Sequence, residues 1–292
     1  KSINLISTVG TTIDGDALGR VINITNDENI YIDNFIIQNG DSGYGAGIYI
    51  STNSNVHFKN CVIQNNSASN NGGGIYINEN ANLLLENSKI SNNTAAKGGA
   101  IYTYGDSIVE LYETDIINNT GTSTAGGIYA NSTMALNINN SSEISNNTAT
   151  TYGGGIYSRK GIINIYDSAI ERNQALTSGG GIYTTNTSIL NVYSTNINYN
   201  TANTYGGAIY INDTTNYLND SIISNNSSNS SGGLHMTGSS NISLNNCEIN
   251  SNRAVTGAGG GIYCNSIGFL EINNESAIIN NEATTYGGGI YT

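Results

Sequence analysis

The sequence predicts an all-β fold, a right-handed single-stranded parallel β-helix of about eleven coils in a chain of 292 residues. Two motifs repeat in fixed phase at intervals of roughly 27 residues, and alternating apolar residues lie between them. The chain has 36 Gly, no Pro and few helix formers, which excludes a repeat built from helical hairpins. Each coil is therefore expected to hold three short strands.

The first strand of each coil follows a Gly-rich turn and carries an Ile-Tyr pair. Successive copies lie 25 to 28 residues apart, and Leu234-His235 is a degenerate copy. Because Ile faces inward, the adjacent Tyr points outward and forms a column along the rod. The members of this column are Tyr49, Tyr76, Tyr102, Tyr129, Tyr157, Tyr183 and Tyr210.

The second strand shows period-two alternation, as at Leu83/Leu85 and Val109/Leu111, which is typical of a strand with one buried face. The third carries an Ile-x-x-Asn motif in every coil. The Asn residues predict a buried ladder whose amides bond along the axis at a backbone turn. Its predicted members are Asn39, Asn66, Asn93, Asn119, Asn147, Asn173, Asn200, Asn226, Asn252 and Asn281.

We interpret residues 1–292 as one β-helix, with an irregular first coil at 1–29 and regular repeats at 30–292. Thr12 is expected to replace the ladder Asn in the first coil, and Thr11 to Arg20 to be its most irregular part. A solenoid needs caps over its open ends, and neither end resembles one. We expect the chain to be a segment of a longer protein, although a filament of end-to-end subunits explains the ends equally well.

The charge balance limits the partners. A formal net charge of −12 argues against nucleic acid, which is bound largely through Lys and Arg. No apolar run approaches the roughly 20 residues that span a bilayer, so we expect no membrane insertion in this segment. An acidic, weakly charged and Asn-rich exterior fits an extracellular protein.

The paired motifs resemble the repeats of the polymorphic outer-membrane protein family and of the adhesin-like β-helix proteins of archaea. Gly98-Gly99-Ala100-Ile101 with Ile116-Ile117-Asn118-Asn119 is one example. The resemblance covers residues 30 to 292, although Ile stands where the outer-membrane family favours Phe. It implies a cell-surface adhesin. The expected partners are other surface proteins, glycans or like subunits.

Other β-helices are polysaccharide lyases or hydrolases, which need clustered carboxylates on neighbouring coils. Asp115 and Glu143 lie at equivalent positions of two consecutive coils, and Lys89 takes the same position one coil earlier. We interpret them as an exposed column, and predict no catalytic residues and no enzyme. Glu110 and Glu271 share another position of the repeat but lie six coils apart. A polysaccharide-active enzyme or a glycan-binding module remains the alternative.

The remaining motifs predict no cofactor and no metal. Asp14-Gly15-Asp16 suggests calcium, but it supplies too few oxygens, and a turn is favoured. Cys61 and Cys247 lie at a position of the repeat that Ser or Thr occupies in most coils. Seven coils separate the two cysteines, which is far beyond the reach of a disulfide. These two and Cys264 are predicted to be free structural thiols.

Two surface features bear on glycans. The Tyr column is a possible glycan-contact face, and stabilisation of adjacent strands by stacked rings is the favoured alternative. Asn-x-Ser/Thr sequons are abundant, and in an archaeal or eukaryotic surface protein several would carry glycan. The candidate sites are Asn23, Asn65, Asn92, Asn118, Asn131, Asn146, Asn186, Asn212, Asn225 and Asn241.

Overall fold

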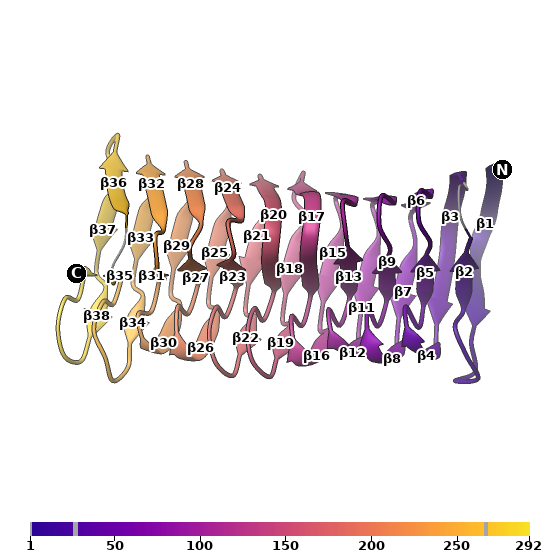
Figure 1. Cartoon of the computed structure of the whole chain (residues 1–292), viewed down its shortest axis with the longest axis horizontal. Helices are drawn as coiled ribbons and strands as arrows, with labels where there is room; N and C mark the ends of the chain where they lie inside the picture. Colours follow the sequence, from indigo (N-terminus) through magenta and orange to yellow (C-terminus); the bar gives the residue numbers. More distant parts are fainter. Residues whose placement is uncertain (1, 26–28, 266–267) are drawn as a thin grey trace.

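The computed structural model describes residues 2–25, 29–265 and 268–292, which form an all-β parallel solenoid of about eleven coils. Figure 1 shows the coils stacked side by side along the long axis, with the two termini at opposite ends. Every strand pair among the described residues is parallel, and each strand pairs with its equivalent one coil away. The predicted fold class is confirmed.

The alternating strands form one continuous face of the rod. Between the two terminal coils their inward residues are buried, as Leu83 and Leu85 on β10 are, whereas the outward residue between these two, Leu84, is half-buried. The members are β1 (Ser2–Asp14), β3 (Asn29–Gln38), β6 (Asn55–Lys59), β10 (Asn82–Glu86), β14 (Ile108–Tyr112), β17 (Ile128–Asn139), β20 (Ile156–Tyr166), β24 (Ile189–Tyr193), β28 (Thr215–Asn219), β32 (Asn241–Asn245) and β36 (Phe269–Asn273).

The Ile-x-x-Asn strands follow after a short turn and bury one Ile each. In the first two coils they are continuous with β1 and β3. The separate members are β7 (Val62–Gln64), β11 (Lys89–Ser91), β15 (Asp115–Ile117), β18 (Glu143–Ser145), β21 (Ala169–Glu171), β25 (Asn196–Asn198), β29 (Ile222–Ser224), β33 (Glu248–Asn250) and β37 (Ala277–Ile279).

The Ile-Tyr strands close each coil. The residues on either side of the Tyr are buried in most coils, as Ile75 and Ile77 are on β9. These strands are continuous with β17 and β20 in two coils. The separate members are β2 (Ile22–Ile24), β5 (Ile48–Ile50), β9 (Ile75–Ile77), β13 (Ile101–Tyr104), β23 (Ile182–Thr185), β27 (Ile209–Asn212), β31 (Leu234–Thr237), β35 (Ile262–Cys264) and β39 (Ile290–Tyr291).

A fourth series of short strands corrects the expectation of three strands per coil. It lies between the Asn turn and the Gly-rich turn, in Ser-, Thr- and Ala-rich sequence without apolar alternation, and forms a separate 10-stranded sheet. Its members are β4 (Asp41–Tyr44), β8 (Ser67–Asn71), β12 (Thr94–Lys97), β16 (Thr120–Thr124), β19 (Thr148–Ala149), β22 (Gln174–Ala175), β26 (Thr201–Tyr205), β30 (Ser227–Ser230), β34 (Arg253–Ala254) and β38 (Glu282–Ala283).

The Gly-rich turns bring successive coils into close contact. Gly72 has a φ of +66°, and a Cβ there would lie 2.4 Å from the carbonyl oxygen of Ile75. A Cβ on Gly73 would lie 2.5 Å from the carbonyl oxygen of Gly99 in the next coil. Both positions therefore require glycine, one for its backbone angle and the other for space.

The first coil departs from the predicted register. The pairing of β1 with β3 shifts between Ile6 and Thr11, so one irregularity precedes the predicted stretch. Within that stretch the strand continues to Asp14, and a turn with positive φ at Asp16 and Ala17 follows. Thr12 pairs with Ile36, three positions before Asn39. Thr12 therefore does not replace a ladder Asn, which corrects that expectation.

Candidate functional site

Nine of the ten predicted ladder residues lie in one column inside the rod. From Asn66 to Asn252, each Nδ2 donates to the Oδ1 of the next member at 2.9–3.0 Å. Each Nδ2 also donates to a backbone carbonyl of the preceding coil, as Asn147 does to Ile116 at 2.8 Å. The column fixes the turn of every coil against its neighbours and offers no free group to a ligand. Its members are Asn66, Asn93, Asn119, Asn147, Asn173, Asn200, Asn226, Asn252 and Asn281.

Asn39 is not part of this column, which corrects the prediction. Ile37 pairs with Ile63, so Gly40 stands opposite Asn66, and the Gly40 N–H donates to the Asn66 Oδ1 at 2.8 Å. Asn39 instead has a φ of 58°, like Asn65, and its amide donates to the carboxylate of Asp14. The shift arises because this coil is one residue shorter than the motif spacing suggests.

The predicted Tyr column is a continuous stack of ten rings from Tyr49 to Tyr291, in which His235 takes one place. Successive centroids lie 4.6–5.3 Å apart with planes within 24°. Tyr102 and Tyr129 are only 6% exposed, and burial raises the pKa of both phenols. The ring faces are covered by neighbouring rings, so only edges and hydroxyls are open to a ligand.

The strand register places Lys89, Asp115 and Glu143 in one column on β11, β15 and β18. Burial and the adjacent Glu143 raise the pKa of the Asp115 carboxyl, and Lys89 opposes this shift. Among the described residues no ion pair joins these three side chains. They form one short column, as the repeat spacing predicts, but only Lys89 is exposed, whereas Asp115 and Glu143 are half-buried.

The Asp-Gly-Asp motif is a hydrogen-bonded turn. Asp14 accepts from Gln38 Nε2 at 2.7 Å and from the Asp16 N–H at 2.9 Å, and these bonds lower the pKa of its carboxyl. In the described parts of the chain, no three His, Cys, Asp or Glu side chains are placed to hold a metal.

All three cysteines are buried and free. Cys61 and Cys247 lie in the Ser/Thr column, where each backbone N–H donates to the hydroxyl of the next coil, Ser88 and Ser276 respectively. Burial raises the pKa of every thiol, that of Cys264 to about 11. They are therefore structural and poorly nucleophilic.

The sequon residues differ in exposure. Asn131, Asn212 and Asn241 are half-buried, whereas the other seven are exposed. Five of the exposed residues share one position, immediately before a buried ladder residue and with φ between 55° and 58°: Asn65, Asn92, Asn118, Asn146 and Asn225.

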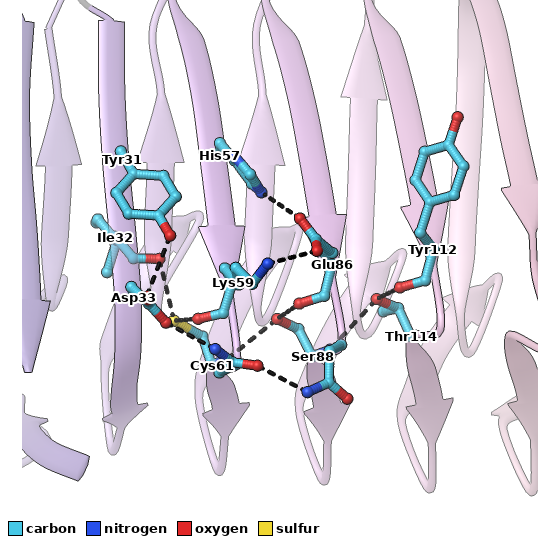
Figure 2. A network of polar contacts seen from close by, with 12 residues as sticks. Tyr31, Ile32, Asp33, His57, Lys59, Cys61, Glu86, Ser88, Tyr112 and Thr114 are labelled. Carbon is cyan, nitrogen blue, oxygen red and sulfur yellow. Dashed lines mark hydrogen bonds and ion pairs between the residues drawn. The ribbon is translucent and has the colours of Figure 1, made fainter. Parts of the chain in front are cut away.

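A cluster of ionisable side chains lies on the outer face of β3, β6 and β10, away from every predicted site (Figure 2). Glu86 accepts from Lys59 Nζ at 2.6 Å and contacts His57 Nε2 at 3.2 Å. Tyr31 donates its hydroxyl to Asp33 at 3.1 Å, and its ring meets the His57 ring edge-on with centroids 5.0 Å apart. Three consecutive coils thus supply two carboxylates, a cation and two rings.

The electrostatics of this cluster follow from its contacts. Hydrogen bonding by Lys59 lowers the pKa of the Glu86 carboxyl, and the same bond raises the pKa of the Lys59 ammonium. Burial and the bond to Asp33 raise the pKa of the Tyr31 phenol. At neutral pH Glu86 and Lys59 are therefore charged and paired, whereas Tyr31 keeps its proton.

An open groove of about 530 Å³ adjoins the cluster and crosses β1, β3, β6, β10 and β14. Tyr31, His57, Leu84 and Glu110 line its floor, one from each of four successive coils. The repeat spacing contains the signal for this set, because these residues lie 26 or 27 positions apart. This signal was not recognised because the position of Glu110 was compared with that of another acid, Glu271, and not with the aromatic and apolar residues of the adjacent coils.

The family model for the right handed beta helix region matches residues 20–196, more than half of the 292 residues. The chain belongs to this family. No curated protein and no solved structure matches it significantly.

This right-handed β-helix has the fold of both surface proteins and polysaccharide-active enzymes, so its function must be argued from its outer face. The cluster provides His57 oriented by Glu86, which is a pair suited to proton transfer. Glu86 is also bound by Lys59, however, so its carboxylate is held by two side chains at once. No helix in the described parts of this β-helix is long and apolar enough to cross a membrane.

Proposed function

We propose that this β-helix is a structural and adhesive rod of a cell-surface protein, without catalytic activity. The observation that carries the proposal is the continuity of its columns, since the Asn ladder and the ring stack each extend through most coils without a break. A protein built as one uninterrupted stack of nearest-neighbour contacts serves to hold a fixed length and a fixed surface.

The exterior supports an extracellular location. Only 10% of the residues are charged, and the outer positions of β17, β20 and β24 carry Asn and Tyr in register, as Asn137, Asn164 and Asn191 do. Neutral amides and phenols suit contact with glycans, other surface proteins or like subunits. This pattern agrees with the resemblance to polymorphic outer-membrane and adhesin-like β-helix proteins.

The location is tested by treating intact cells of the native source with a protease that cannot enter them. A surface rod is digested and reacts with antibody before lysis. Protection until lysis, under conditions in which a known surface protein is cut, would contradict the proposal.

The second candidate is a polysaccharide-active enzyme, and the contact between His57 and Glu86 is the observation that favours it. The purified protein is incubated with neutral, acidic and amino polysaccharides, and new reducing ends are measured. We expect no cleavage. Cleavage that disappears in His57→Gln, but persists in His235→Gln, would establish the enzyme instead.

A further inference from the structure

The floor of the groove is apolar and aromatic, in contrast to the same column further along the rod. Tyr31, His57 and Leu84 are neighbours on β3, β6 and β10, and all three are half-buried. Beyond β14 the equivalent positions on β17, β20 and β24 are all Asn. An aromatic and aliphatic floor is the surface on which the C–H face of a sugar ring packs.

The rim of the groove is a row of amides. Asn82 Nδ2 donates to Asn55 Oδ1 at 2.8 Å, and Asn55 Nδ2 donates to Asn29 Oδ1 at 3.1 Å. All three side chains are exposed, so each keeps hydrogen-bonding capacity for solvent or for ligand hydroxyls. The floor and the rim run along the rod axis, and five coils at the strand spacing give a length of about 19 Å.

The carboxylates differ in what they can offer a ligand. Glu86 is bound by Lys59 and His57, and Asp33 accepts from Tyr31 and from Asn60 Nδ2 at 2.8 Å. Glu110 lines the groove, and no hydrogen bond or ion pair joins it to another side chain in the described ranges. A cationic group in the groove would therefore find an unpaired carboxylate, whereas an anionic sugar would be repelled.

We propose that this groove binds a short oligosaccharide that bears free amino groups. Leu84 and the rings of Tyr31 and His57 pack against the sugar faces, the amide rim binds hydroxyls, and Glu110 pairs with an ammonium group. The network around Glu86 holds the floor in place without contributing a charge to the ligand. This proposal specifies a ligand for the adhesive function proposed above.

The experiment titrates the protein with a glucosamine tetramer and follows binding by calorimetry and by the methyl signals of Leu84. The N-acetylated tetramer and a galacturonate tetramer serve as the neutral and anionic probes. We expect the glucosamine tetramer to bind most tightly and the galacturonate tetramer not to bind. Equal affinity for all three probes, or none for the amino sugar, would overturn the proposal.

Two variants locate the site. Glu110→Gln is expected to weaken binding about tenfold, since it removes a charge-assisted contact. The matched control is Glu271→Gln on β36, which stands in the same outward column six coils away and removes the same charge from the protein. An equal loss in both variants would mean that the cationic probe senses only the net charge, and would refute the site.

Leu84→Asn tests the floor without endangering the fold, because Asn137 occupies the equivalent position two coils further on. It should weaken binding of the amino tetramer, while its unfolding curve stays close to that of the wild type. The two proposals fail separately. A protease-accessible surface protein that ignores the amino tetramer refutes the groove alone, and specific binding by a protected, intracellular protein refutes only the surface function.

Discussion

The imidazole of His235 stacks on the ring of Tyr210 with centroids 5.0 Å apart and planes 7° apart. Tyr263 covers its other face at 4.8 Å, and Nδ1 lies 2.9 Å from Ser231 Oγ. The degenerate copy of the Ile-Tyr motif therefore preserves the ring stack with a titratable ring. Burial lowers the pKa of His235 to about 4.

This shift predicts a pH-dependent stability. Because the folded protein disfavours the imidazolium, the stabilisation is fully present above pH 6.5, the unfolded value, and is lost as the pH falls toward 4. The loss should reach about 3 kcal/mol in the free energy of unfolding. Urea denaturation at about pH 7.5 and about pH 4.5 measures it.

His235→Tyr is the matched variant, since Tyr fills this position in the adjacent coils. The remaining carboxylates titrate alike in both proteins, so the difference between the two pH dependences isolates His235. If both proteins lose the same stability on acidification, His235 is not the group responsible.

The Asn ladder predicts that removing one buried amide strongly destabilises the coils next to it. Asn147 accepts from the Asn119 amide and backbone N–H, and donates to Asn173 Oδ1 and Ile116 O, all in the buried interior. Asn147→Ala leaves these partners unpaired, and we expect a loss of about 3 kcal/mol or more. Hydrogen exchange should become faster in the coils on either side of residue 147 before it does so at the ends.

The control is the adjacent Asn146, which is exposed and has a φ of 55°. Asn146→Gly suits that backbone angle, and its stability should lie within about 0.5 kcal/mol of the wild type. Comparable destabilisation by both changes would show that the turn, and not the buried amide, carries the energy.

The geometry of the turns predicts that replacing glycine by alanine destabilises the protein at one position and not at another. Gly72→Ala places a Cβ at a φ of +66° and 2.4 Å from a carbonyl oxygen, so we expect destabilisation of more than about 1 kcal/mol. Gly19 has nothing within 4 Å of an added Cβ, and Gly19→Ala should be close to neutral. Thermal unfolding of the two variants is the measurement, and equal melting temperatures would be inconsistent with this account.

The sequons predict an occupancy pattern if the native source glycosylates Asn. The exposed residues just before the ladder, such as Asn65 and Asn92, should carry glycan more often than the half-buried Asn131, Asn212 and Asn241. Intact mass and glycopeptide mapping of the native protein provide the check. Preferential modification of the half-buried group would show that exposure in the folded rod does not govern the reaction.

The features that could be predicted from the sequence are those that repeat from coil to coil. Columns built from one residue type, such as the Ile positions and the Asn ladder from Asn66 onward, were readable because each coil repeats the same contact. Asn39 was misplaced, since its coil is one residue shorter and the motif matched the wrong one of two adjacent positions. The fourth strand series was missed because backbone pairing in Ser- and Thr-rich turns leaves no apolar alternation.

The sequence by itself determined the fold class, the number of coils, the inward columns and the free state of the thiols, because each depends on periodicity and spacing along the chain. Only the tertiary structure decided that Tyr31, His57, Leu84 and Glu110 form one groove, and that His57 and Lys59 share Glu86. The physical reason is that the outward residues at this position of β3, β6, β10 and β14 differ from coil to coil. Their contacts depend on the register between coils of unequal length, which the stacking of the whole rod sets.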